Sequence, residues 1–146
     1  MIILDTDCLS LLERKGSAES YRLSAKLSEF SPEEIAVTII TFEEQMRGWM
    51  AFIAKANSIE KQISAYRKLE KFLETYKFIP IVQFDEKDGE IFQDLKSRKI
   101  KVGTMDLKIA SIAISHNALL ISRNLSDYDR IPNLRVQDWT RESYTN

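Results

Sequence analysis

The chain has 146 residues, and its 21 lysines and arginines nearly balance 22 aspartates and glutamates, for a formal net charge of −1. Its length and 44% hydrophobic content suit one folded domain, expected over residues 1–146, and exclude a disordered chain. No apolar run approaches the roughly 20 residues of a membrane span. The single Cys8 excludes an internal disulfide, so we expect a cytoplasmic protein. Near-neutral charge argues against holding nucleic acid by a large basic surface alone.

Short β-rich runs alternate with longer helical patterns along the chain. The predicted strands cover residues 1–4, 35–40, 78–84, 118–122 and 134–136. Pro80 lies within the third run and weakens it or moves it to a sheet edge. Strands that alternate with helices predict an α/β fold with a parallel sheet covered on both faces.

The segments between these strands carry helical patterns. The predicted helices cover residues 7–14, 21–30, 42–56, 59–76 and 85–98, with a further one beginning at residue 104. Asp85 and Thr104 are the expected N-caps of the last two. Apolar residues recur at steps of three and four on the fourth helix, at Ile59, Ile63, Tyr66, Leu69, Phe72, Leu73 and Tyr76. Such a stripe is more often core than interface.

Acidic residues gather where the predicted strands end or the next helix begins. They are Asp5 and Asp7, Glu43 and Glu44, Asp106, and Asp127 and Asp129. Chemistry collects at the carboxyl ends of parallel strands, so we expect these acids at one edge of the sheet. Clustered carboxylates repel one another unless a cation neutralises them, and Mg²⁺ and Mn²⁺ prefer oxygen ligands.

Most of these acids also have a purely structural explanation. Thr41 and Glu44 match a capping box, in which Glu44 serves only helix amides. Thr104 can cap a helix whose first turn holds Asp106. Asp127 lies in a turn-rich stretch. Asp5 has no such explanation, because a carboxylate that ends a buried apolar strand is unfavourable. Separate structural roles would also have to place all of these acids at the same sheet edge.

Five segments in order resemble the PIN domain family, and within it the VapC-type toxins of bacterial toxin–antitoxin pairs. They are residues 3–7 (ILDTD), 38–48 (TIITFEEQMRG), 103–110 (GTMDLKIA), 121–128 (ISRNLSDY) and 130–139 (RIPNLRVQDW). The resemblance implies a three-layer α/β/α fold around a mostly parallel sheet of about five strands. It also implies an RNA endonuclease that depends on Mg²⁺ or Mn²⁺ and acts as a toxin.

The resemblance assigns the catalytic and metal-binding roles to Asp5, Glu44, Asp106 and Asp127. Glu44 is preferred to Glu43 because it lies four residues before Gly48. In the implied mechanism, ions held by these acids activate a water that attacks the phosphodiester. Neighbouring positions expected at the site are Thr6, Asp7, Thr104 and Asn124.

Two positions depart from the family's pattern. Asp7 stands where many relatives have asparagine, and Ser122 replaces a more usual threonine. Candidate contacts to RNA phosphates are Arg47, Arg98, Lys99 and Lys101. The resemblance further implies a VapB-type antitoxin, which such toxins take up on helices corresponding to residues 42–76, and a homodimer.

Other functions stay open at this point. One is a PIN nuclease with a housekeeping role. Another is a haloacid-dehalogenase-like phosphatase, but that class requires a hydroxyl residue at the position of Leu9 in this chain. A third is a receiver-type signalling domain, but this chain lacks the lysine that such domains carry near the end of the chain. His116 is expected to end a helix, and Cys8 to pack within the first helix without acting as a nucleophile.

Overall fold

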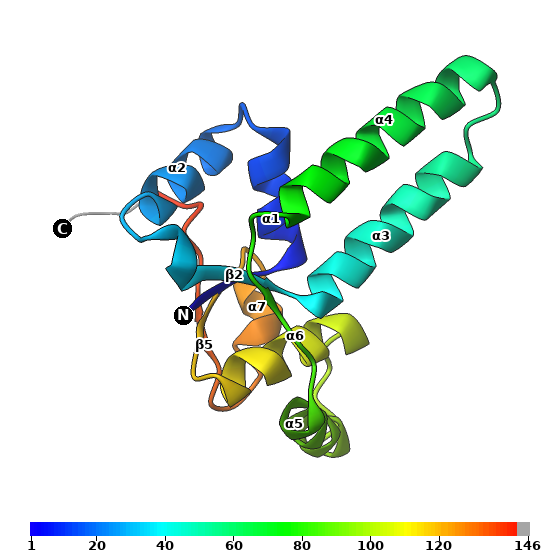
Figure 1. Ribbon diagram of the computed structural model, residues 1–146. Helices are drawn as coiled ribbons and strands as arrows, with labels where there is room; N and C mark the ends of the chain where they lie inside the picture. Colours follow the sequence, from blue (N-terminus) through cyan, green and yellow to red (C-terminus); the bar gives the residue numbers. More distant parts are fainter. Residues whose placement is uncertain (143–146) are drawn as a thin grey trace.

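A computed structural model describes residues 1–142 and contains one five-stranded sheet (Figure 1). The strands are β1 (Ile2–Leu4), β2 (Ile35–Thr38), β3 (Ile81–Val82), β4 (Leu119–Ile121) and β5 (Arg135–Gln137). Their order is β3-β2-β1-β4-β5, and every adjacent pair is parallel. The predicted α/β class and parallel sheet are confirmed. The two-residue β3, which follows Pro80, forms one edge of the sheet, as expected.

Helices cover the two faces of this sheet and also extend beyond it. They are α1 (Thr6–Arg14), α2 (Ala18–Leu27), α3 (Ile39–Ala54), α4 (Ile59–Tyr76), α5 (Glu86–Ser97), α6 (Thr104–Ser115) and the short α7 (Leu125–Tyr128). A 3₁₀ turn, Pro32–Glu34, precedes β2.

Side-chain alternation along β1 connects two hydrophobic cores. Ile2 and Leu4 belong to the core formed with α1 and α2, whereas Ile3 belongs to the core formed with α5 and α6. Successive strand residues point to opposite faces, so a buried central strand is apolar at every position. The result is the expected three-layer arrangement, with β1 at its centre.

Helices α3 and α4 form an antiparallel hairpin that projects away from the sheet (Figure 1). Three aromatic side chains in mutual contact hold the base of this hairpin together. The ring of Phe42 lies 5.8 Å from that of Phe72 and 5.0 Å from that of Tyr76, measured between centroids. The carboxyl end of β2 therefore leads directly into a rigidly packed helix pair.

Two of the predicted helix caps are wrong. The second strand ends at Thr38, and the Thr38 hydroxyl accepts a hydrogen bond from the Thr41 amide at 3.2 Å. Thr41 therefore lies inside α3, which excludes the capping box between Thr41 and Glu44. At the start of α6, Gly103 takes the cap position and Thr104 is the first helical residue. Asp85 does cap α5, as predicted, through a capping box with Asp88.

The apolar stripe of α4 lies mostly outside the core. Phe72 is buried, but Ile59, Ile63, Tyr66 and Leu73 are between 46% and 63% exposed. The core interpretation is thus wrong for most of the stripe, because the hairpin extends past the sheet that would cover it. Among the described residues, no helix is both long enough and apolar enough to span a bilayer.

Substitution of Thr38 tests whether its hydroxyl stabilises the start of α3. Thr38→Val keeps the buried shape but removes the capping oxygen, so we expect the free energy of unfolding to fall by about 1 kcal/mol. Thr75→Val is the matched control, because the Thr75 hydroxyl only bonds back to the Lys71 carbonyl within α4. Urea denaturation measures both, and equal midpoints would contradict the assigned cap.

Candidate active site

Asp5 lies at the carboxyl end of the central strand and begins α1. Its backbone N–H donates to the Ile121 carbonyl at 3.1 Å, which continues the pairing of β1 with β4. Its Oδ1 accepts from the Cys8 amide at 2.8 Å and caps α1. Asp5 is buried, and this desolvation raises the pKa of its carboxyl group, although hydrogen bonds from Ser122 and Cys8 oppose the effect.

Glu44 lies in α3, one and a half turns after β2. The Thr6 hydroxyl donates to Glu44 Oε1 at 2.6 Å, so α1 fixes the direction of this carboxylate. Desolvation raises the pKa of Glu44, and the nearby charges of Asp106 and Asp5 raise it further. The Glu44 carboxylate accepts a hydrogen bond from Thr6 and not from helix amides, so the capping-box explanation of Glu44 does not hold.

Asp106 lies in the first turn of α6. The Tyr128 hydroxyl donates to Asp106 Oδ1 at 3.2 Å, and Tyr128, the last residue of α7, is buried. Desolvation raises the pKa of Asp106, with a smaller contribution from the charge of Asp127. The sequence offered no sign of Tyr128, because a tyrosine 22 positions away follows no local spacing rule.

These three carboxylates share one cavity of about 540 Å³, here called the acidic cavity. Its lining residues are Asp5, Thr6, Asp7, Glu44, Asp106, Arg123 and Asn124. Segments at the ends of β1, β2 and β4 and at the start of α6 thus meet at one edge of the sheet, as the sequence predicted. Six of the lining residues were expected there, and Arg123 was not.

Arg123 brings a cation to the mouth of the acidic cavity. Its guanidinium donates to both carboxylate oxygens of Asp7, at 2.7 and 2.8 Å, and also pairs with Glu19 of α2. The bidentate bond with Arg123 lowers the pKa of Asp7. The sequence could not reveal these pairs, since their members lie 116 and 104 positions apart.

Comparison with known proteins identifies the family. The family model for the PIN domain matches residues 2–134. The chain belongs to the PIN domain family.

Relatives in this family carry the name VapC. The chain is 32% identical over 111 residues to Ribonuclease VapC2 of Rickettsia felis, which covers 73% of this chain and 75% of the relative. It is 28% identical over 120 residues to Ribonuclease VapC1 of Haemophilus influenzae, covering 82% and 85%. The crystal structure of VapBC2 from Rickettsia felis, bound to a promoter DNA fragment, superposes with a TM-score of 0.71 at 28% identity. That match covers 95% of this chain and 99% of the other.

The remaining predicted acid, Asp127, stands beside the acidic cavity of this PIN domain. It lies in α7, where its Oδ2 accepts from the Asn124 side-chain amide at 2.9 Å. Asn124 lines the cavity, and its own amide N–H donates to the Ser122 hydroxyl at 2.9 Å. Asp127 is therefore linked to the cavity through Asn124. Thr104 precedes Asp106 by two residues and is exposed.

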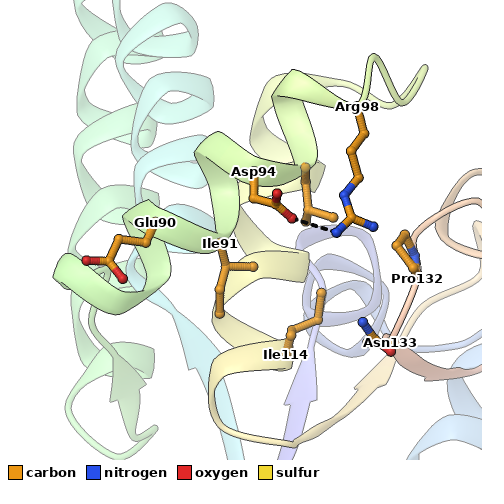
Figure 2. Close-up of a pocket in the computed structure, with 8 residues that line it drawn as sticks. Glu90, Ile91, Asp94, Arg98, Ile114, Pro132 and Asn133 are labelled. Carbon is orange, nitrogen blue, oxygen red and sulfur yellow. Dashed lines mark ion pairs between the residues drawn. The ribbon is translucent and has the colours of Figure 1, made fainter.

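The four predicted phosphate contacts lie apart from this set. Arg47 pairs with Glu43 on the surface of α3. Arg98 pairs with Asp94 at 3.0 Å and lines a separate cavity between α5, α6 and Pro132 (Figure 2). Lys99 and Lys101 lie in the loop between α5 and α6, and both are exposed. Arg123 is the one basic residue that lines the acidic cavity in the described part of the chain.

Cys8 and His116 take the structural roles expected of them. Cys8 is buried in α1, and desolvation raises the pKa of its thiol, which keeps it unreactive. His116 is the C-cap of α6.

The donor chemistry of the acidic cavity fits Mg²⁺ or Mn²⁺. Carboxylate oxygens are the ligands that these ions prefer, and three ionisable carboxyl groups in one cavity favour a cation strongly. As the side chains stand within residues 1–142, no three Asp, Glu, His or Cys groups already converge on a single ion position. The Thr6 hydroxyl bonds to Glu44 and the Tyr128 hydroxyl bonds to Asp106. Binding of an ion would therefore require the Glu44 and Asp106 side chains to turn into the cavity.

The opposite pKa shifts of Asp5 and Asp7 predict opposite effects of neutralising them. Burial raises the pKa of Asp5 above the ordinary 3.8, so ionisation of Asp5 lowers stability as pH rises through its folded-state pKa. Asp5→Asn keeps a capping oxygen and removes this cost. In excess chelator we expect the variant to unfold at higher urea than the parent at pH 7, with the gap closing below pH 4.

Asp7→Asn is the matched comparison. Arg123 lowers the pKa of Asp7, so the ionised form stabilises the fold above pH 3.8 and this contribution is lost as pH falls through the folded-state pKa. Because Asp7 is half exposed, the loss at pH 7 should stay below about 1 kcal/mol. Destabilisation by Asp5→Asn at pH 7 would contradict the assigned cost of burial.

Proposed function

We propose that this chain is a ribonuclease that depends on a divalent metal and serves as the toxin of a toxin–antitoxin pair. The observation that carries the proposal is the meeting of Asp5, Glu44 and Asp106 in one cavity at the carboxyl edge of a parallel sheet. The relatives named Ribonuclease VapC support RNA as the substrate. The one buried, unpaired cysteine suits action in the cytoplasm.

Asp5, Glu44 and Asp106 are the residues that would hold Mg²⁺ or Mn²⁺, with Asp127 completing the set. When bound, such ions lower the pKa of water and offset the charge that builds on a phosphate during hydrolysis. The protein contributes the positions of the carboxylates. The Cys8 amide, the Thr6 hydroxyl and the Tyr128 hydroxyl each fix one of them.

Arg123 is the proposed phosphate contact at this site. An arginine held by two carboxylates keeps its guanidinium in one place, and it has further N–H groups with which to bind a phosphate oxygen. These remaining donors lie in the lining of the acidic cavity, where they can position a phosphate beside the carboxylates. This role belongs to Arg123 in preference to Arg98, which lies in a different cavity.

The neighbouring glutamates of α3 test the nuclease function. Glu44→Gln removes a carboxylate from the acidic cavity, and we expect RNA cleavage with Mg²⁺ or Mn²⁺ to fall at least 100-fold. Glu43→Gln is the matched control, because Glu43 pairs with Arg47 outside the cavity, and we expect near-parental rates. Cleavage of a labelled RNA measures both, and full activity in excess chelator would contradict the metal requirement.

The exposed stripe of α4 supports a protein partner. Ile59, Ile63, Tyr66 and Leu73 present apolar side chains on a projecting hairpin, and exposed apolar patches of this kind mark interaction sites. Solved structures of VapBC2 from Rickettsia felis and VapBC-1 from Haemophilus influenzae contain similar chains, at 28% and 26% identity. We infer that a VapB-type antitoxin and a second copy of this chain cover the hairpin.

The toxin role predicts an effect on growth. Induced expression of the parent chain in bacteria should arrest growth, and Glu44→Gln should relieve the arrest at equal protein level, whereas Glu43→Gln should not. Optical density and immunoblotting provide the measurement. Harmless expression of a chain that cuts RNA in vitro would favour a housekeeping nuclease instead.

A further inference from the structure

A second cavity adjoins the acidic cavity and shares two of its lining residues, Thr6 and Glu44. It has a volume of about 450 Å³ and lies between α1, α3 and α4. We call it the aromatic cavity, because Trp49 and Phe52 form part of its wall. A ligand with one part at the acidic residues can therefore place its next part in the aromatic cavity.

One face of α3 builds this wall. The lining residues of α3 are Glu44, Gln45, Gly48, Trp49 and Phe52, whose spacing of one, four, five and eight residues marks a single helix face. Gly48 stands at the middle of that face. Among the described residues, and apart from its chain neighbours and its own helix backbone, a Cβ added at Gly48 meets no atom within 4 Å, so a larger side chain there has open space to enter beside the cavity.

The chemistry of the aromatic cavity combines flat rings with polar groups. The Trp49 and Phe52 rings lie 5.8 Å apart in an edge-to-face arrangement, and Phe52 is 44% exposed. The Lys68 ammonium lies 5.0 Å from the Phe52 ring centroid. Gln45 is held in place, since Tyr76 donates to its Oε1 at 2.6 Å and its amide donates to Ser10 and Glu13 at 3.3 Å.

We propose that the aromatic cavity is a subsite for one nucleobase of the RNA, that of the nucleotide next to the scissile phosphate. This inference rests on the proposed ribonuclease function. Unpaired bases in RNA are bound by stacking on aromatic side chains and by hydrogen bonds along the base edge. Phe52 and Trp49 supply the stacking surface, Ser10 and Glu13 face the edge, and Lys68 lies within reach of a flanking phosphate.

The placement favours a base over a segment of a partner protein. The exposed apolar residues of α4 that suit a protein partner, Ile59, Ile63, Tyr66 and Leu73, do not line the aromatic cavity in the described structure. The cavity instead continues into the carboxylates that would act on the backbone. Of its three charged lining residues, Glu13 and Glu44 offer acceptors, and Lys68 offers a cation for an RNA phosphate.

Filling the cavity tests the proposal. Gly48→Leu places a side chain in the open space without loss of helix propensity. Gly89→Leu is the matched control, because Gly89 also lies within a helix, α5, and an added Cβ there likewise meets no described atom within 4 Å. We expect Gly48→Leu to lower kcat/KM on a short single-stranded RNA about 10-fold, mostly through KM, and Gly89→Leu to match the parent.

A second variant reports stacking directly. The chain has two tryptophans, so Trp139→Phe leaves Trp49 as the only one, and adding Asp106→Asn blocks cleavage under the proposed function. RNA should quench Trp49 fluorescence in this protein, whereas an oligomer of the same length with abasic ribose units should quench it far less. Phe52→Leu should weaken the binding seen with RNA several-fold.

RNA cleavage by the parent chain tests the ribonuclease function, and the glycine variants test the base subsite separately. If the parent chain cuts no RNA, the ribonuclease function fails. If the parent cuts RNA but Gly48→Leu and Gly89→Leu have equal kcat/KM, the base subsite is overturned and the cavity serves another occupant, such as a protein segment. Equal quenching by RNA and by the abasic oligomer would overturn it as well.

Discussion

The burial of mutually repelling carboxylates at the end of a parallel sheet is the constraint around which this fold is arranged. Asp5 ends the central strand, and the ends of β2 and the start of α6 bring Glu44 and Asp106 to the same cavity. Desolvation raises the pKa of all three. A fold optimised for stability alone would replace them, so their retention is best explained by a ligand that carries positive charge.

The surrounding groups hold this unfavourable arrangement in place. Each of the three carboxylates accepts at least one hydrogen bond: Asp5 from the Cys8 amide, Glu44 from the Thr6 hydroxyl and Asp106 from the Tyr128 hydroxyl. These donors come from segments that are themselves capped or buried, since α1 begins at the cap formed by Asp5 and Tyr128 lies in the core. The carboxylates are therefore held at one sheet edge by the fold itself, and within residues 1–142 they reach a common ion position only after their side chains rotate.

The sequence predicted what depends on local order and strand topology. Asp5 and Glu44 follow predicted strands, and Asp106 begins the predicted helix before the fourth strand, which was enough to expect these acids at one sheet edge. The predicted end of the second strand was wrong. Ile39 and Ile40 are β-branched and favour a strand, whereas the chain begins α3 at Ile39. The sequence also missed Arg123 with Asp7 and Glu19, and Tyr128 with Asp106, because pairs so distant in sequence leave no periodic signal.

Helix α3 links the chemistry to the surface where partners would bind. Its first turns carry Glu44, its middle carries Gly48 and the aromatic face, and its length packs against α4, whose exposed stripe faces solvent. A protein that covers this hairpin would stand beside the aromatic cavity and within one helix length of the carboxylates. Inhibition by such a partner would thus need no change of fold, because a protein seated on the hairpin would obstruct the approach of RNA to the acidic cavity.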